Sequence, residues 1–179
     1  TLTAALVAAP ASAKDAKQEV SRKVVVTGKA LEVSDRIWSA DDPEIGKTAP
    51  LVAGEGFDGQ KVAVGGPAAK PRIVVFVAHW CPHCQREVPL IVKLAKHGKF
   101  DGVAVDTVAT GTNPDYPNYP PSKWLAREKW PFANVLADSA DTVALQAYGG
   151  TGFPFFVFLD AEGKPLPDME VPYLAPANE

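Results

Sequence analysis

The sequence contains only two cysteines in 179 residues, too few for the disulfide framework that stabilises small secreted domains. Its net charge of -3 and its lack of any basic run give no indication of nucleic-acid binding. It has no run of about 18 or more apolar residues, so it predicts no membrane-spanning helix. The hydrophobic fraction of 46% is ordinary for a globular domain that buries a core. Since a disulfide framework is lacking, that core must stabilise the fold.

The two ends of the chain differ in composition from its middle. Residues 1–13, TLTAALVAAPASA, are small and apolar and end in Ala-Ser-Ala, which is the pattern of a signal-peptide core followed by a cleavage site. An Ala-rich terminus without that function is the alternative. We predict a signal-peptide remnant at 1–13, an N-terminal extension with one strand at 14–48, a main domain at 49–168 and an irregular tail at 169–179.

The middle of the chain alternates between segments typical of strands and of helices. The run IVVFVA (73–78) is continuously apolar, as expected of a strand covered on both faces. The segment 82–97 repeats apolar residues at helical spacing between Pro82, which suits a first helical position, and Gly98, which suits an end. Further strands are predicted at 23–33, 102–110, 132–138 and 155–160, further helices at 120–130 and 140–148, and a loop at 34–60. This alternation predicts an α/β sheet with helices on its faces.

A polar segment rich in proline and tyrosine, TGTNPDYPNYPPS (110–122), separates a predicted strand from the next predicted helix. It is too polar for the core, and it lies at the end of the sheet that carries the cysteines. Two interpretations remain open from the sequence: the segment borders a substrate groove, or it is an insertion without function.

The two cysteines, Cys81 and Cys84, lie three residues apart in the stretch AHWCPHCQREVP (78–89). They stand at the junction of a buried strand and a helix, where the helix dipole and unpaired backbone N–H groups stabilise a thiolate. In C-x-x-C motifs at such places the pKa of the thiol falls to roughly 3.5–7.5. We therefore predict a redox-active dithiol, in which Cys81 is the nucleophile and Cys84 resolves the mixed disulfide formed at Cys81.

The segment from about Pro50 to Pro165 resembles the thioredoxin fold, and more closely its extracytoplasmic TlpA/ResA-like branch. The resemblance rests on several short matches rather than on any one of them. The matching residues are Ala49-Pro50, Phe76, Ala78, Trp80, the pattern C-x-x-C-x-x-E-x-P of Cys81, Cys84, Glu87 and Pro89, Gly152-Phe153-Pro154 and Asp160-Ala161-Glu162-Gly163. The resemblance implies an α/β fold with a thioredoxin-like central mixed β-sheet flanked by helices, preceded by an N-terminal extension.

The resemblance also implies roles for two residues outside the C-x-x-C motif. Pro154 is expected to be a cis-proline beside the dithiol, which hinders metal entry and leaves the backbone carbonyl and N–H of Phe153 free to pair with an extended substrate; an ordinary strand-entry proline is the alternative. Glu87 is expected to shuttle the proton of Cys84 or raise its pKa, and a solvated carboxylate is the alternative. Val75 occupies the strand position where cytosolic thioredoxins carry a buried acid.

The residues around the cysteines are expected to tune the site. Trp80 is expected to pack over the dithiol, shield it and contact substrate together with Phe153. The Pro82-His83 dipeptide resembles that of DsbA-like oxidases, and a partly protonated His83 favours the Cys81 thiolate and makes the disulfide a stronger oxidant. A neutral, solvated His83 is the alternative. His79 and His97 are predicted to be surface residues.

Together these features predict an extracytoplasmic bacterial thiol-disulfide oxidoreductase that is secreted, periplasmic or in the cell envelope. The overall resemblance favours a reductase, whereas the Pro-His dipeptide favours an oxidase, so the direction stays open. The predicted partners are thiols or disulfides of exported proteins and a membrane or envelope redox partner. The protein is predicted to be a monomer that binds no nucleic acid and needs no cofactor beyond the Cys81–Cys84 disulfide.

The main alternative is a zinc- or copper-binding module of the cell envelope, with Cys81, Cys84, His79 and His83 as ligands. Four ligands between residues 79 and 84 cannot easily surround one tetrahedral ion, so no metal site is predicted. Covalent haem attachment needs C-x-x-C-H, and Gln85 stands at the last position. The end of the chain, PDMEVPYLAPANE (167–179), lacks helical periodicity although the family usually closes with a strand and a helix. We expect either a truncated chain or a sheet that is covered differently.

Overall fold

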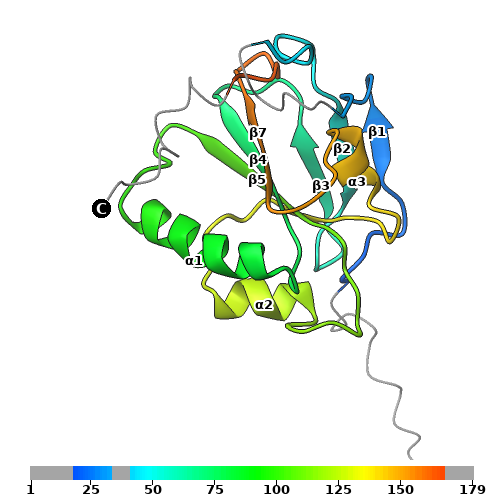
Figure 1. The fold of residues 1–179 in the computed structure, drawn as a ribbon, viewed down its shortest axis with the longest axis vertical. Coiled ribbons are helices and arrows are strands. Elements are labelled where there is room, and N and C mark those ends of the chain that lie inside the picture. The colour runs from blue at the N-terminus through cyan, green and yellow to red at the C-terminus, as the bar shows by residue number, and fades with distance from the viewer. Residues whose placement is uncertain (1–17, 34–40, 168–179) are drawn as a thin grey trace, which may run out of the picture.

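A computed structural model of the chain describes residues 18–33 and 41–167 (Figure 1). The predicted signal-peptide remnant at 1–13, the predicted tail at 169–179 and part of the predicted loop, 34–40, lie outside the described residues. Within the described part, every helix is too short or too polar to cross a membrane.

The described residues form one mixed sheet of seven strands. In chain order the strands are β1 (Val25–Thr27), β2 (Leu51–Glu55), β3 (Lys61–Gly65), β4 (Arg72–Val77), β5 (Ala104–Ala109), β6 (Val135–Ala137) and β7 (Phe155–Leu159). Their order in the sheet is β1-β2-β6-β5-β4-β7, with β3 paired to β2. Strands β4, β5 and β6 are parallel, and β7 runs antiparallel beside β4. The carboxyl ends of the three parallel strands therefore meet at one edge of the sheet.

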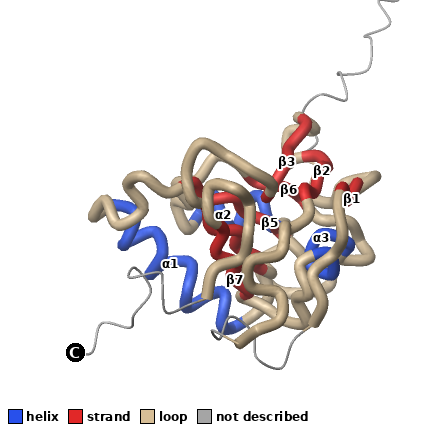
Figure 2. The backbone as a smooth tube through the Cα atoms, turned by 90° about the horizontal axis from the view of Figure 1, so that it is seen from above, coloured by secondary structure: helices blue, strands red, loops and turns tan. Residues whose placement is uncertain are grey.

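Helices cover both faces of this sheet. They are α1 (Pro82–Lys96), α2 (Pro121–Arg127) and α3 (Val143–Ala147). Residues of α1 and α2 pack in one apolar cluster with one face of the sheet, and residues of α3 pack in a second cluster with the other face. Figure 1 shows α1 and α2 on the same side of the sheet, and both Figures 1 and 2 show α3 apart from α1.

Strand β4 lies at the centre of the molecule because both of its faces are apolar. Val74 and Phe76 belong to the α3-side cluster, whereas Ile73, Val75 and Val77 belong to the cluster beneath α1 and α2. All five side chains are buried. The continuous apolar run is thus a strand covered on both faces, as predicted, and it holds the start of α1 at a rigid place.

The predicted loop at 34–60 was wrong in its second half. Residues 51–55 form β2, which pairs with β3 as an antiparallel hairpin. Gly54 lies within this strand, and a Cβ at that position would lie 2.9 Å from Ser21 Oγ and 3.0 Å from Leu136 Cδ1. This glycine therefore permits a close approach between neighbouring segments inside the sheet.

The predicted strand at 23–33 was too long, and β1 occupies only residues 25–27. β1 pairs with β2, so the N-terminal extension contributes a strand to the main sheet. Helix α1 matches its predicted range to within one residue, and Gly98 follows it with φ +69°. The other predicted strands and helices are present, each with fewer residues than predicted.

Candidate active site

Cys81 lies at the junction between β4 and α1 and is the N-cap residue of the helix. Its backbone is extended, and Pro82 occupies the first helical position, where a missing N–H leaves no bond unmade. The side chain is 6% exposed. Its Sγ donates a hydrogen bond to the backbone carbonyl of Phe153 at 3.2 Å. The predicted nucleophile is therefore close to the surface at the positive end of a helix.

Cys84 lies one turn into α1 and is fully buried. The backbone N–H of Ala78 donates to its Sγ at 3.4 Å. Burial raises the pKa of the Cys84 thiol to about 12, the adjacent Cys81 sulfur adds to the rise, and the Ala78 N–H opposes it. Both cysteines are free, buried thiols in this structure, and Cys81 keeps a small exposed fraction of 6% whereas Cys84 has none.

The loop before β7 forms the opposite side of the site. The Phe153–Pro154 peptide bond is cis, and the Phe153 ring meets the Trp80 indole at a right angle with 5.3 Å between centroids. In this state the Phe153 carbonyl accepts a hydrogen bond from the Cys81 thiol, and its pairing with a substrate stays a prediction. A thiolate or a disulfide at Cys81 has no proton to donate, so either form releases that carbonyl.

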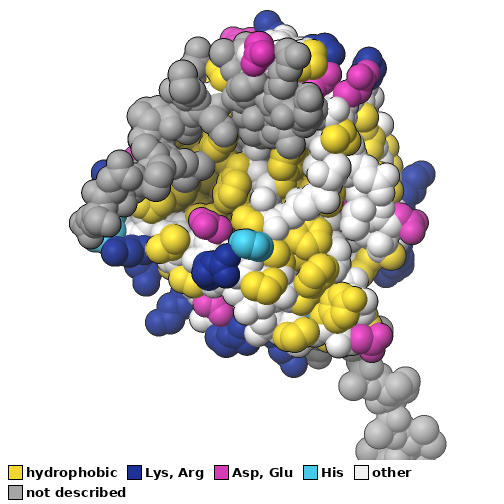
Figure 3. Space-filling view, in the orientation of Figure 1, with side chains coloured by type: hydrophobic (Ala, Val, Ile, Leu, Met, Phe, Trp, Pro, Cys, Tyr) yellow, Lys and Arg dark blue, Asp and Glu magenta, His cyan; other side chains and the backbone are white. Residues whose placement is uncertain are grey.

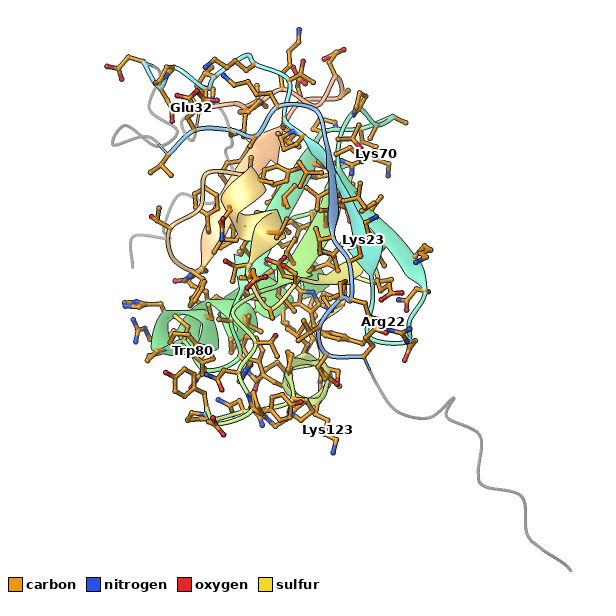
Figure 4. The ribbon with its side chains drawn as sticks, turned by 90° about the vertical axis from the view of Figure 1, so that its right-hand side faces the viewer. Arg22, Lys23, Glu32, Lys70, Trp80 and Lys123 are labelled. Carbon is orange, nitrogen blue, oxygen red and sulfur yellow. The ribbon has the colours of Figure 1, made fainter. Side chains whose placement is uncertain are left out.

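Trp80 connects the cysteines with the loop between β5 and α2. Its indole Nε1 donates to the carbonyl of Gly111 at 2.8 Å, and the ring of Tyr116 packs edge-on against it at 4.9 Å. Gly111 has φ +59°, and a Cβ there would lie 3.2 Å from the Phe153 ring. The structure thus places the 110–122 segment against the site, and Figure 4 shows Trp80 beside the start of α1.

The three histidines lie in different environments. His97 is exposed, as predicted, whereas the prediction of a surface position for His79 was wrong, because its side chain is 1% exposed. Its ring nitrogens contact backbone groups of Pro117 and Asn113 in the loop after β5, which satisfies a buried imidazole. The isolated motif gave no signal for contacts with such a distant loop.

His83 is exposed in the first turn of α1, and its Nδ1 lies 2.6 Å from the guanidinium of Arg86. Because a guanidinium can only donate, Nδ1 accepts this bond and carries no proton in this arrangement. Arg86 was not among the predicted site residues, although its position three residues after a histidine on a helix was the available signal. In this geometry the positive charge near the start of α1 is therefore that of the Arg86 guanidinium.

Glu87 lies on α1 three residues after Cys84 and is half-buried. Its role in proton transfer stays a prediction. Val75 is buried in β4, and the buried carboxylate of Asp138 lies at the end of β6, where it accepts a hydrogen bond from Thr110 Oγ1 at 2.8 Å. Within α1, Glu87 is the acidic residue nearest to Cys84 in the sequence.

The metal-binding alternative finds no support in the positions of the side chains. Among residues 18–33 and 41–167, no three His, Cys, Asp or Glu side chains gather in a way that could hold a metal ion. His79 uses its ring nitrogens for loop contacts, and His83 uses Nδ1 for Arg86. Figure 3 shows a histidine, a basic and an acidic side chain together among hydrophobic ones at the centre of the face in view.

Comparisons with known proteins agree with this geometry. A model of the AhpC/TSA family matches residues 45–167. The methylamine utilization protein MauD of Methylorubrum extorquens is 28% identical over 123 residues, which cover 68% of this chain and 55% of MauD. The chain therefore spans little more than half the length of this curated relative.

Two solved structures show the same fold. The thioredoxin domain of a thiol-disulfide oxidoreductase from Bacteroides vulgatus matches with a TM-score of 0.54 and 26% identity, covering 69% of this chain and 86% of that domain. A thiol:disulfide interchange protein from Bacteroides sp. matches with a TM-score of 0.53 and 26% identity, covering 69% of this chain and 79% of that protein. The predicted thioredoxin-like fold is confirmed.

Proposed function

This chain belongs to the AhpC/TSA family, and from that premise we propose that it is a thiol-disulfide oxidoreductase that acts through Cys81 and Cys84. One observation carries the proposal. A nearly buried thiol at the start of α1 contacts the backbone just before Pro154, and a second, fully buried thiol follows one turn later. The likeness to a thiol-disulfide oxidoreductase domain supports it.

The reaction is a two-step exchange of disulfides. The Cys81 thiolate attacks one sulfur of a substrate disulfide, forms a mixed disulfide and releases the other substrate sulfur, which takes up a proton. Cys84 then loses its proton and attacks the Cys81 sulfur, which releases the second substrate thiol. The substrate gains two electrons and the protein ends with a Cys81–Cys84 disulfide; the reverse sequence oxidises a substrate dithiol.

The finer parts of the proposal concern direction, partners and location. We favour a reductase of exported protein disulfides that is recharged by a membrane or envelope redox partner. The TlpA/ResA-like pattern around Cys81 and Pro154 supports this direction, and the Pro82-His83 dipeptide supports the reverse one. The Ala-Ser-Ala pattern that ends at residue 13 supports a location outside the cytoplasm.

Trapping of the intermediate tests the proposed function. With insulin as a protein disulfide, Cys84→Ser should accumulate a mixed disulfide at Cys81, because no thiol is left to resolve it. Cys81→Ser should form none, and the wild type should turn over when dithiothreitol is supplied as the reductant that returns the Cys81–Cys84 disulfide to the dithiol. Adducts detected by mass spectrometry only at Cys84, or wild-type protein that never forms the Cys81–Cys84 disulfide, would contradict the proposal.

The equilibrium with glutathione then gives the direction. A reduction potential near the thioredoxin value of about -270 mV supports a reductase. A value near the DsbA value of about -120 mV supports an oxidase. Quantitative alkylation of the two thiols measures the fraction of protein that is reduced at each ratio of glutathione to glutathione disulfide.

A further inference from the structure

One buried histidine takes no part in the proposed exchange of disulfides. His79 lies between the end of β4 and Trp80, and its side chain is 1% exposed. A buried imidazole needs hydrogen-bond partners for its ring nitrogens. For His79 these partners are backbone groups of the loop between β5 and α2.

The two contacts fix the protonation state of the His79 ring. Nδ1 lies 2.7 Å from the carbonyl oxygen of Pro117, which can only accept a hydrogen bond, so Nδ1 carries the proton. The backbone N–H of Asn113 donates to Nε2 at 3.3 Å, so Nε2 is bare. The ring is therefore neutral, and a second proton at Nε2 would point at the Asn113 N–H.

The surroundings of the ring favour this neutral form. Burial is the largest influence and lowers the pKa of His79 below its ordinary value, whereas the hydrogen bond to the Pro117 carbonyl and, after it, the negative charge of Glu19 oppose the shift. Glu19 comes from the segment before β1, and its carboxylate accepts hydrogen bonds from the N–H and Oγ of Ser122 at the start of α2. The ring of Tyr119 meets the imidazole edge-on with 5.9 Å between centroids. Along the chain, the titratable groups that directly follow His79 are the thiols of Cys81 and Cys84 and the imidazole of His83.

The loop that His79 holds forms one wall of the site. Its Gly111 carbonyl accepts the Trp80 indole N–H, and its Tyr116 ring packs against the same indole. Trp80 in turn packs against Phe153, whose carbonyl accepts a hydrogen bond from the thiol of Cys81. Tyr116 is 47% exposed, so part of this wall is open to a partner.

We propose that His79 is a positioning residue of the exchange reaction, whose neutral ring fastens the 111–117 loop so that Trp80 and Tyr116 form a fixed wall for a protein substrate beside Cys81. The inference rests on the proposed function, since the wall matters only when a protein disulfide or thiol docks there. We expect a small disulfide to make fewer contacts with this wall than a protein does, so its reaction should depend less on His79.

The test compares a large and a small substrate in the wild type and in two variants. In His79→Ala, which loses both contacts with the loop, the KM for insulin should rise about five- to tenfold, an effect of the size of one net hydrogen bond. The kcat for insulin and the rate with glutathione disulfide should both stay within about twofold, because the cysteines keep their contacts. The matched control is His97→Ala, which removes an exposed histidine just after α1 and should behave as the wild type does.

A second measurement uses the unaltered protein. NMR spectra that correlate the ring protons and nitrogens of histidine should show His79 protonated only at Nδ1 near neutral pH. As the pH falls and the ring gains its second proton, the KM for insulin should rise over the same pH range in the wild type. In His79→Gln, which has no titrating group at this position, that rise should be absent.

The possible results separate the two proposals. An unchanged KM for insulin in folded His79→Ala protein, or a neutral ring protonated at Nε2, overturns the role of His79 and leaves the exchange reaction intact. Wild-type protein that exchanges with neither insulin nor glutathione disulfide overturns the proposed function, and the role of His79 falls with it.

Discussion

The two thiols of the site lie in different environments although only two residues separate them. Cys81 is near the surface and donates to the Phe153 carbonyl. Cys84 is fully buried, and burial raises the pKa of its thiol to about 12 because a thiolate is poorly solvated there. Near neutral pH Cys84 is almost entirely protonated, so it can attack a mixed disulfide only after a base has taken its proton.

We predict that Glu87 takes the Cys84 proton, since it is a half-buried carboxylate one turn further along α1. In Glu87→Gln, conversion of the mixed disulfide into the Cys81–Cys84 disulfide should slow about 10²-fold, as is typical when a general base is removed. The first attack by Cys81 should keep its rate. Quenched-flow mixing followed by alkylation measures the two steps separately.

The control for this experiment is Glu162→Gln, which changes an exposed carboxylate in the turn after β7. The resolving step of Glu87→Gln should also become about tenfold faster for each unit by which the pH is raised, as long as the pH stays below the raised pKa of Cys84, because the thiolate fraction of Cys84 grows in that proportion. If Glu87→Gln and Glu162→Gln resolve the mixed disulfide at the same rate, another base removes the proton.

Helix α1 supports the site through its charge as well as its position. The first turn of α1 holds no acidic residue, although negative groups are favoured at the positive end of a helix. A thiolate at its N-cap, Cys81, therefore meets no competing carboxylate in that turn. The guanidinium of Arg86, which donates to His83, adds a permanent positive charge to the same end.

Removal of this charge should make the protein less oxidising. In Arg86→Gln the reduced form loses part of the stabilisation of its thiolate, and the equilibrium constant with glutathione should shift about two- to fivefold toward the disulfide. Lys96→Gln, at the other end of α1, should leave the constant unchanged. An equal shift in both variants would mean that overall charge, and not position at the helix start, sets the equilibrium.

The elements that local signals define could be predicted, and those that depend on distant residues could not. β4 and α1 follow from a continuous apolar run, a proline at the first helical position and a glycine after the end. β2 was missed because Gly54 indicates a turn when it is read alone. Glycine is needed at this position because Ser21 and Leu136 approach it closely, and no local sequence pattern predicts that these residues come together.

The same distinction holds for the site as part of the whole molecule. The placing of both cysteines at the start of α1 could be predicted because that motif is contiguous in the sequence. The burial of His79 could not, since its partners Asn113 and Pro117 are 34 and 38 residues away. Only the parallel pairing of β4 with β5 brings that loop to the end of β4.

The stability of the whole protein should reflect the buried His79. Its pKa is lowered from the ordinary 6.5 in the folded state, so the unfolded chain binds more protons as the pH falls through this range. The contribution of the neutral ring to the free energy of unfolding is fully present above about pH 6.5, and it is lost as the pH falls toward the lower pKa that His79 has in the folded protein. Urea unfolding at pH 7.5 and pH 5 should show a larger loss of stability in the wild type than in His79→Gln.

Equal losses in the two proteins would contradict this prediction and would assign the acid sensitivity to other groups. Since carboxylates also titrate near pH 5, the comparison depends on the difference between the proteins and not on either curve alone. The His97→Ala protein should follow the wild type, because its missing histidine is exposed in the folded state.

The contact between Cys81 and Phe153 also has a consequence for how the protein is made. The two residues are 72 positions apart in the chain, which a ribosome covers in about 4–14 s at about 5–20 residues per second. The dithiol is therefore synthesised several seconds before the loop that covers it and before β7, which closes the sheet beside β4. During that interval the nascent chain carries an uncovered pair of thiols, so a pause in translation between residues 84 and 153 lengthens its exposure to oxidants and to the thiols of other chains.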